Sequence, residues 1–357
     1  NKEGYIMSSP WNIDQLDRRA FMAALAAVGA GSLLPASAEA QGADFKGRQL
    51  LSSGFGGSTM DIIQKAAFDP FDAATGAKST QVPMQSAAAL ARMKAEAGNP
   101  QIDMYQFSGG QEAQAKSEGL TEPMKSVPNL ANVPGGLKDP DGHWVTWAVI
   151  AEGIVYNKDK IPTPPTSYKD FFKPEYKGHI AFPAITNGFG MDFLVMLART
   201  FGGGEDNIEP GFAALAKLKN ETIFKAASDL PGLFGQGDIW IMPYDTGNAF
   251  KTAQSGLPVA FATPQEGSPA VPITSCIAKG AKNADVANGA INYLLKPEAQ
   301  IAIAQGMRWS ASNVNTKLPA ELASEIPAVS QLAQLDRAKI NANRAAWTER
   351  WNREIAR

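Results

Sequence analysis

The chain has 357 residues, 44% of them hydrophobic and 19% charged, which is typical of a globular protein with two domains and excludes a disordered or collagen-like chain. Its 33 Lys and Arg residues nearly balance 35 Asp and Glu residues, so no basic field for nucleic acid is predicted. A single cysteine, Cys276, excludes an internal disulfide framework, and two histidines, His143 and His179, argue against imidazole metal sites and His-dependent catalysis.

Residues 1–40 have the three parts of an export signal. The adjacent arginines Arg18 and Arg19 precede an uncharged stretch over 20–35, and small residues then stand at both ends of Ala38-Glu39-Ala40. The arginine pair resembles the twin-arginine signal of bacteria. We expect cleavage after Ala40 and a periplasmic mature protein. A membrane anchor and a buried helix are the alternatives, and the apolar stretch is short for a membrane span.

Strands and helices alternate in the pattern over residues 48–110. Strands are predicted over 48–52, 78–84 and 102–106, and helices over 58–76 and 86–97. We expect Ser58 and Ser86 to cap these helices, Pro70 to kink the first helix and Gly76 to end it. Such alternation predicts a parallel sheet with helices on both faces, which binds ligands beyond the C-terminal ends of its strands.

The rest of the chain repeats this alternation after a connecting region. A proline- and glycine-rich stretch over 123–142 precedes a long predicted strand over 144–157, and a second proline-rich connection follows over 161–174. Further strands are predicted over 179–182, 238–243, 259–262 and 272–278, and helices up to Arg199, from Pro210, over 283–295 and over 330–356. Two α/β halves follow from this pattern.

Seven short motifs occur in the order found in bacterial extracellular solute-binding proteins of ABC transporters. They are Gly153–Lys160, Phe171–Gly178, Gly237–Trp240, Gly256–Val259, Pro264–Gly267, Ala281–Asn283 and Asn292–Ala299. The chain resembles the spermidine/putrescine-type branch of this family. The resemblance implies a type II periplasmic binding protein fold: two α/β lobes with parallel-dominated sheets, helices on both faces and two crossover strands as a hinge.

The resemblance also implies a domain division and a function. Lobe one would comprise 41–148 and 266–315, and lobe two 149–265 and 316–357 with the C-terminal helix. The protein would be a monomeric periplasmic receptor that closes on a small organic solute (an amino-acid-like, amine or carboxylate compound) and delivers it to an ABC permease in the inner membrane. No cofactor, metal site or enzymatic activity is expected.

The candidate ligand-binding residues follow predicted strands or begin predicted helices. In the first half, glycine, hydroxyl and amide groups would offer hydrogen bonds to the ligand. In the second half, Asp245 would pair with a ligand ammonium group. The candidates are Gly57, Ser58, Thr59, Gln106, Phe107, Ser108, Trp147, Thr186, Asn187, Gly188, Tyr244, Asp245 and Asn248.

Each candidate also has a purely structural interpretation. Gly57–Thr59 and Asp245 are compatible with ordinary helix caps, and the tryptophans Trp147 and Trp240 with core packing. Glu152, in the predicted crossover strand, is interpreted as a structural pairing residue. Arg199 and Arg308 are conceivable partners of an anionic ligand, although surface roles suit both.

Alternative functions remain open at this point. An exported enzyme of the same fold is one, although the sequence has no Gly-x-Ser-x-Gly or His-Glu-x-x-His motif. The polyamine-binding branch that the chain resembles usually has an acidic residue in the strand before the Ala281–Asn283 motif, and Val271–Ser275 has none. The iron-binding branch of the same family has adjacent tyrosines, which Tyr244-Asp245 does not provide. A structural or adhesive exported protein is the last alternative.

Overall fold

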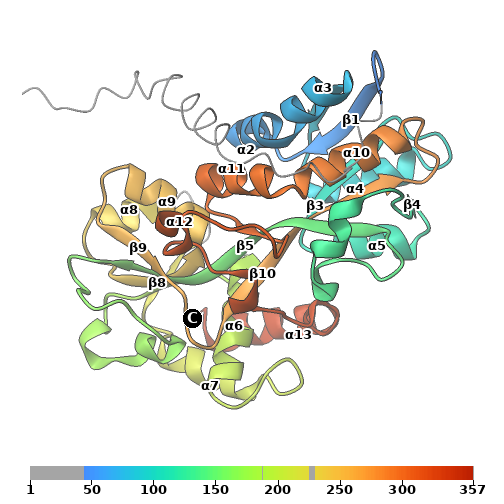
Figure 1. Ribbon diagram of the computed structural model, residues 1–357. Coiled ribbons are helices and arrows are strands. Elements are labelled where there is room, and N and C mark those ends of the chain that lie inside the picture. The colour runs from blue at the N-terminus through green and yellow to red at the C-terminus, as the bar shows by residue number, and fades with distance from the viewer. Residues whose placement is uncertain (1–43, 187, 225–229, 357) are drawn as a thin grey trace, which may run out of the picture. The chain divides into compact units, whose positions relative to one another are not determined.

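Two long strands, β5 (Trp144–Asn157) and β10 (Ser268–Ala278), lie side by side and connect two groups of elements (Figure 1). The protein is described by a computed structural model that covers residues 44–186, 188–224 and 230–356, all within one compact unit. The predicted export signal over 1–40 lies outside the described residues. The strand predicted over 144–157 is confirmed at both ends.

The first group of elements is built on the parallel sheet expected from the start of the chain. β1 (Gln49–Gly54) pairs in parallel with β2 (Lys78–Pro83) and β3 (Met104–Ser108). Short segments β4 (Thr121–Glu122), η3 (Pro128–Asn132) and η4 (Gly135–Leu137) precede β5. The helices of this group are α2 (Gly57–Ile63), η2 (Gln64–Phe68), α3 (Asp69–Thr75), α4 (Ser86–Ala95), α5 (Gln111–Ser117), α10 (Ala284–Leu294) and α11 (Pro297–Met307).

The second group of elements is attached to the other end of β5. β8 (Ile241–Asp245) and β9 (Val259–Ala262) pair antiparallel with β5, and β6 (Ala181–Pro183) pairs in parallel with β7 (Thr222–Phe224). Its helices are η5 (Tyr168–Phe172), η6 (Pro174–Tyr176), α6 (Gly188–Thr200), α7 (Glu209–Lys217), α8 (Leu230–Gly235) and α9 (Thr246–Gln254). In Figure 1, α8 and α9 lie on one side of β8 and β9, and α6 and α7 on the other.

The sheet is mixed rather than dominated by parallel pairs. β5 pairs antiparallel with β8, β9, β10 and β11 (Ser310–Ala311), and β10 pairs antiparallel with β3 and β4. Parallel pairing holds within β1–β2–β3 and within β6–β7. The reason is topological, since a chain that leaves one group along β5 and returns along β10 places the two strands antiparallel.

Local signals predicted the first helix only in part. Pro70 follows a π-helical turn, η2, and Gly76 ends α3 in the left-handed conformation with φ 73°, as expected. The capping predictions were wrong, because α2 begins at Gly57 without a side-chain cap and Ser86 is the first residue of α4. The Ser86 hydroxyl instead accepts a hydrogen bond from the backbone N–H of Ser108 at 2.9 Å, which ties α4 to the end of β3.

The C-terminal segment crosses between the two groups. After α12 (Ala320–Ala323) and η8 (Val329–Gln331), β12 (Leu332–Ala333) pairs in parallel with β10, and α13 (Arg337–Glu354) follows. The helix predicted over 330–356 therefore begins later than expected. Asp336 sets its start, because its carboxylate accepts from the backbone N–H of Lys339 at 3.0 Å.

Each group has its own hydrophobic core. The first surrounds Phe71, Trp147 and Ile291, and the second surrounds Phe193 together with Trp351 of α13. The tryptophans of the C-terminal helix pack against the body, since Trp347 and Trp351 are both buried. Cys276 is also fully buried, and burial raises the pKa of its thiol well above the usual range. The lobe bounds given above remain a prediction.

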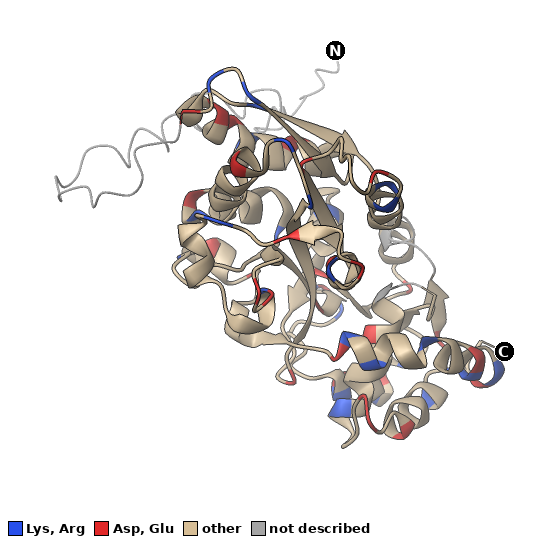
Figure 2. Ribbon diagram, turned by 90° about the vertical axis from the view of Figure 1, so that its right-hand side faces the viewer, with Lys and Arg blue, Asp and Glu red and all other residues tan. Residues whose placement is uncertain are grey.

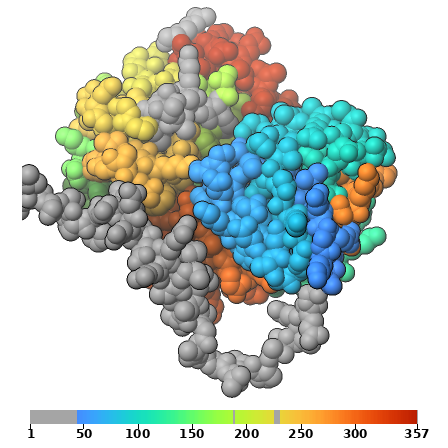
Figure 3. All heavy atoms as spheres, turned by 90° about the horizontal axis from the view of Figure 1, so that it is seen from above, coloured from blue at the N-terminus to red at the C-terminus, as the bar shows by residue number. Residues whose placement is uncertain are grey.

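Lys, Arg, Asp and Glu residues are interspersed along the described ribbon (Figure 2). On α13, Arg350 donates to Glu209 and Glu354, so basic and acidic residues neutralise each other locally. Seen from above, the blue to cyan residues of the first group and the gold residues near 250 occupy neighbouring areas of one face (Figure 3). Arg308, directly after α11, stacks over Phe250 of α9 at 3.7 Å from the ring centre.

Candidate functional site

The predicted site residues of the first group differ in how accessible they are. Gly57 and Ser58 are exposed and Thr59 is half-buried at the start of α2. Gln106 is 1% exposed, and its amide nitrogen donates to Ser52 Oγ at 3.1 Å and to the Ser53 carbonyl at 2.8 Å. The Gln106 amide nitrogen is therefore bonded to β1 and not directed at solvent.

Aromatic candidates in the first group are packed rather than presented to solvent. Phe107 is fully buried, and its ring stacks on Tyr105 with centres 6.2 Å apart. Trp147 is also fully buried, 6.1 Å from the ring of Trp309. Of the residues at the end of β3, Ser108 alone is partly exposed. Gly57, Ser58, Thr59 and Ser108 are exposed enough for the predicted contact with a ligand. Phe107 and Trp147 are fully buried, so a ligand contact fits these two residues less well.

The structure brings the predicted segments of the second group together. Thr186 is exposed, Gly188 begins α6, and Asn187 lies outside the described residues. Phe189, the next residue of α6, packs edge-on against Tyr244 at a ring-centre distance of 4.7 Å. The start of α6 therefore lies beside the end of β8, as expected for strand ends that share one site.

Asp245 is the N-cap of α9. Its carboxylate accepts from the backbone N–H of Asn248 at 2.9 Å and from the Asn248 side chain at 2.6 Å. Asp245 is 3% exposed, and burial raises the pKa of its carboxyl, opposed by these hydrogen bonds. The capping interpretation is confirmed, and the predicted ligand contact remains a prediction.

Asp245 belongs to a group of buried carboxyls that sequence reasoning did not assemble. Glu152 on β5 lies directly opposite Asp245 on β8 in the strand register. Side chains of directly opposed residues share a face of the sheet with Cβ atoms roughly 5 Å apart. Asp192, in the second turn of α6, is 1% exposed and adds a third carboxyl. We call Glu152, Asp192 and Asp245 the buried acidic cluster.

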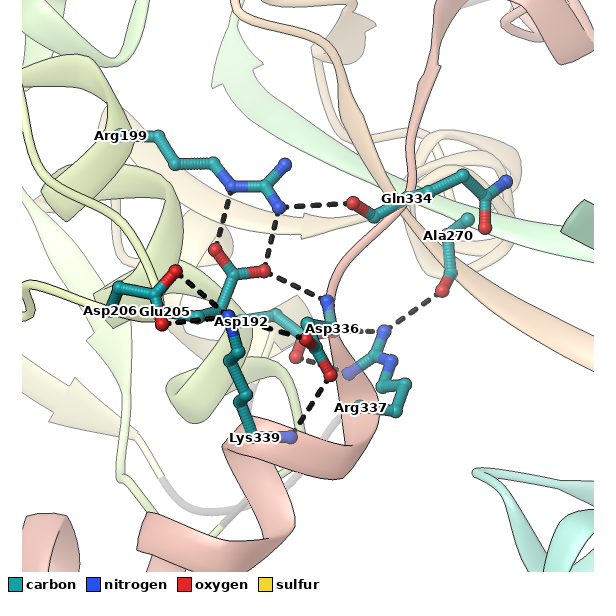
Figure 4. Close-up of polar contacts among 9 residues, drawn as sticks. All are labelled: Asp192, Arg199, Glu205, Asp206, Ala270, Gln334, Asp336, Arg337 and Lys339. Atoms are coloured by element: carbon teal, nitrogen blue, oxygen red, sulfur yellow. Dashed lines mark hydrogen bonds and ion pairs between the residues drawn. The ribbon is translucent and has the colours of Figure 1, made fainter.

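One guanidinium group enters this cluster from α13. Arg337 binds Asp192 with two hydrogen bonds, one of them 2.8 Å long, and also donates to the Ala270 carbonyl on β10 at 2.8 Å (Figure 4). Burial lowers the pKa of Arg337, but the charges of Asp192 and Glu152 outweigh burial and raise it above the usual value. Arg337 thus joins the second group to β10 at a buried ion pair.

Glu152 has a different environment from Asp192. It is 4% exposed, and its Oε1 atom has no hydrogen-bond partner among the described residues. Burial raises the pKa of Glu152 well above the usual range, and the neighbouring charge of Asp192 raises it further. The charge of Asp245 acts in the same direction, whereas Arg337 opposes the shift. Two neighbouring carboxyls cannot both ionise without cost when the guanidinium is bonded to only one of them.

A fourth buried carboxyl lies in the first group. Glu112 on α5 is 4% exposed and accepts a hydrogen bond from Thr274 Oγ1 at 3.2 Å. Thr146, opposite Thr274 in the β5–β10 register, has a buried hydroxyl without a partner among the described residues. Burial raises the pKa of Glu112, and the positive charge of Arg337 partly offsets this shift. The charge of Arg337 therefore acts on acidic groups of both halves.

The sequence does contain a signal for this cluster: two of its acidic residues each stand alone within an apolar stretch. Glu152 interrupts the strand WAVIAEGIV, and Asp192 interrupts the helix GFGMDFLVML. A buried charge needs a partner, so each should have been treated as a site candidate. The two arginines singled out from sequence have other roles, since Arg199 pairs with Glu205 and Arg308 with Glu325.

Metal binding has no support within residues 44–186, 188–224 and 230–356, where no group of three His, Cys, Asp or Glu residues is arranged to hold a metal ion. Both histidines have structural contacts. His143 Nδ1 lies 2.8 Å from Thr121 Oγ1, and the His179 ring stacks on Trp240 with centres 3.7 Å apart.

Comparison with known families identifies the chain. Residues 99–343, more than half of its length, match the family described as bacterial extracellular solute-binding protein. The chain belongs to this family. The expected two-lobe, type II periplasmic binding fold is confirmed by solved structures, and the two groups of elements are the two lobes of this solute-binding protein.

Individual relatives of the solute-binding protein are identical to it at 24% to 28% of the aligned positions. The thiamine-binding periplasmic protein of Escherichia coli is 24% identical over 75% of this chain and 81% of its own length. The spermidine/putrescine-binding periplasmic protein of Escherichia coli is 26% identical over 52% of this chain and 54% of its own. Iron uptake protein A1 of Synechocystis is 28% identical over 36% of each chain.

Among solved structures, an extracellular solute-binding protein from Bordetella parapertussis is 27% identical and superposes with a TM-score of 0.81. The superposition covers 87% of this chain and 99% of the other. In the described part of the solute-binding protein, no helix combines the length and apolarity needed to cross a bilayer. The family consists of binding proteins, which agrees with the prediction of a receptor.

Proposed function

We propose that this protein captures a small organic solute carrying a cationic nitrogen between its two lobes and delivers it to an ABC permease. The buried acidic cluster supports this ligand class, because it holds three carboxyls, Asp245 among them, and one guanidinium that enters from α13. A cationic group would supply the missing positive charge through charge-assisted hydrogen bonds. The exposed ends of the lobe-one elements, Gly57–Thr59 and Ser108, would bind the remainder of the solute.

The relatives support the same ligand class. Two of them are named for thiamine and for spermidine or putrescine, compounds that all carry a positively charged nitrogen. The missing acidic residue in Val271–Ser275 argued against a polyamine. Glu112, hydrogen-bonded to Thr274, places a carboxyl beside this strand from another element. Polyamines therefore belong in the set of candidate ligands.

Delivery would depend on hinge closure. β5 and β10 run between the two lobes, so bending at these strands would move the lobes as bodies. A solute that contacts both lobes binds the closed state more tightly and shifts the population toward it. The proposed hinge lies at the bounds 148/149 and 265/266, next to Glu152 and Ala270.

The relatives and the N-terminal pattern of the chain support a periplasmic location. Both relatives from Escherichia coli are periplasmic proteins, and residues 1–40 have the pattern of an export signal cleaved after Ala40. We propose a monomeric periplasmic receptor without a nucleic-acid partner, in line with the balanced charge of the chain. Ferric iron is the alternative cargo, supported by one relative that matches 36% of the chain.

A solute screen tests the proposal. The protein is denatured and refolded to remove carried-over ligand, and thermal unfolding is measured with putrescine, spermidine, thiamine, 4-aminobutyrate, citrate and ferric citrate. A bound solute at 100 times its Kd stabilises the folded state by about 2.7 kcal/mol. We expect stabilisation by at least one cationic compound and none by citrate. Stabilisation by ferric citrate alone would favour iron, and chemical conversion of a bound solute would establish an enzyme.

Replacing Asp245 by asparagine should weaken the affinity for a cationic solute by about 1.5–3 kcal/mol, because a charge-assisted hydrogen bond is lost. The stability of the free protein should change little, since an asparagine oxygen can still accept from the Asn248 N–H and cap α9. Calorimetric titration measures the affinity and urea unfolding the stability. Unchanged affinity in the Asp245→Asn variant would restrict Asp245 to its capping role.

A further inference from the structure

The buried acidic cluster contains two more carboxyl groups than its single basic partner can neutralise. In Figure 4, the acidic residues around the start of α13 are each paired with a basic side chain. The pairs are Asp192 with Arg337, Glu205 with Arg199, and Asp206 and Asp336 with Lys339. No described basic side chain forms an ion pair with Glu152, whose carboxyl neighbours that of Asp192.

The groups that face Glu152 come from four other elements. Asp192 approaches from α6, Asp245 from β8, Arg337 from α13 and Tyr168 from η5. Arg337 is the single cation among them, and its two bonds to one carboxylate go to Asp192. Tyr168 is buried, and burial followed by the charge of Glu152 raises the pKa of its hydroxyl. A negative charge on Glu152 would therefore be surrounded mainly by acidic groups.

Protonation removes this conflict in the ligand-free protein. A neutral Glu152 carries one O–H group, which can donate to the Asp192 carboxylate, and it adds no second charge to this buried site. Two carboxyls that lie in contact in this way commonly share one proton, because both cannot ionise at once. The unpartnered Oε1 atom, on a side chain 4% exposed, is left as a free acceptor.

Binding of a cationic solute would favour the ionised form of Glu152 over the protonated form. Because Glu152 and Asp245 are directly opposed in the β5–β8 register, a cation that binds Asp245 arrives within one side-chain length of Glu152. An adjacent positive charge favours the ionised carboxylate. The Glu152 Oε1 atom, which has no partner in the absence of ligand, would then belong to a carboxylate that binds the cation.

We propose that Glu152 holds a proton in the ligand-free receptor and releases it to solvent when the cationic group of the solute binds. The step is Glu152–COOH plus a solute cation giving a Glu152–COO⁻···cation pair and a free proton. It rests on the proposed function, which supplies the cation. Proton release would make Glu152 a determinant of specificity for positively charged solutes. The affinity for such a solute would also rise with pH.

The ligand-free half of this proposal is tested by unfolding. Urea denaturation of the wild type and Glu152→Gln is followed from pH 5 to pH 8. Glutamine reproduces the neutral carboxyl, whereas the unfolded wild type ionises near pH 4.3. We expect the wild-type midpoint to fall relative to that of Glu152→Gln as pH rises, because folding then requires proton uptake by Glu152. Parallel midpoints across this range would overturn the proposal.

The release step is tested by calorimetry at pH 7 in phosphate and in Tris, two buffers with different ionisation enthalpies. Putrescine, thiamine and 4-aminobutyrate are the probes. We expect release of about one proton per bound cation and an affinity that rises by up to about tenfold per pH unit while Glu152 is protonated. Glu152→Gln should release no proton and bind about tenfold more weakly.

The control variant is Glu209→Gln, which removes an exposed carboxyl paired with Arg350 and should leave proton release unchanged. Binding without proton release, or equal release from Glu152→Gln, would overturn this inference and leave the receptor function intact. Failure of all three probes to bind would overturn the assignment of a cationic ligand and the release step with it. The two failures are therefore distinguishable.

Discussion

Replacing Arg337 by methionine is expected to lower the free energy of unfolding by about 3–5 kcal/mol, the usual cost of removing one partner of a buried ion pair. The variant leaves the Asp192 carboxylate, 1% exposed, without its two guanidinium bonds. It also leaves the Ala270 carbonyl on β10 without its Arg337 donor. Urea unfolding at pH 7 measures the loss.

Two further variants separate the buried pair from a general effect on α13. Adding Asp192→Asn to Arg337→Met should recover a large part of the lost stability, because the uncompensated charge is removed. Arg350→Met, on the same helix, removes bonds to Glu209, whose side chain is 68% exposed, and should cost no more than about 1 kcal/mol. Equal losses for Arg337→Met and Arg350→Met would contradict the importance of the buried pair.

Replacing Gly190 by alanine should cost about 3 kcal/mol, toward the upper end of the range for overpacking. A Cβ atom at this position would stand 2.3 Å from the Ala184 carbonyl oxygen and 2.8 Å from Ile185 Cα. Both are backbone atoms, so the start of α6 and the segment after β6 would have to separate. Thr186 lies in that segment, so solute affinity should fall together with stability.

Gly232 is the matched control for this substitution. It lies in the short helix α8, and a Cβ atom there would meet no other atom within 4 Å. Gly232→Ala should therefore be neutral or stabilising by up to about 1 kcal/mol, since alanine is favoured over glycine within helices. Thermal unfolding of the two variants provides the comparison. A Gly190→Ala protein as stable as Gly232→Ala would show that α6 can move without cost.

The sequence was sufficient for the architecture where hydrophobic pattern and turn residues agree. The long strand over 144–157 is mostly apolar and bounded by turn residues, and its ends were predicted correctly. The family motifs then supplied the two-lobe arrangement. Helix starts were less certain, because Ser58 and Ser86 have the composition of caps but different hydrogen-bond partners in the fold. Local composition does not determine those partners.

The candidate site was predicted less completely than the fold. Strand ends were expected to converge, and the contact between Phe189 and Tyr244 shows that two of them do. The buried acidic cluster could not be assembled from local patterns, because Glu152, Asp192 and Arg337 are separated by up to 185 positions in the chain. Only the packing of α6 and α13 on β5 brings these charges together. Gln106 and Trp147 have suitable chemistry but their side chains point into the sheet and core.

The position of α13 has a consequence for the way lobe two can fold. Trp347, Trp351 and Ile355 share the second core with Phe193 of α6, which lies about 150 positions earlier in the chain. Contacts between residues so distant in sequence require the closure of a long loop, and such contacts form slowly. We therefore expect the apolar face of α6 to stay open until α13 docks on it.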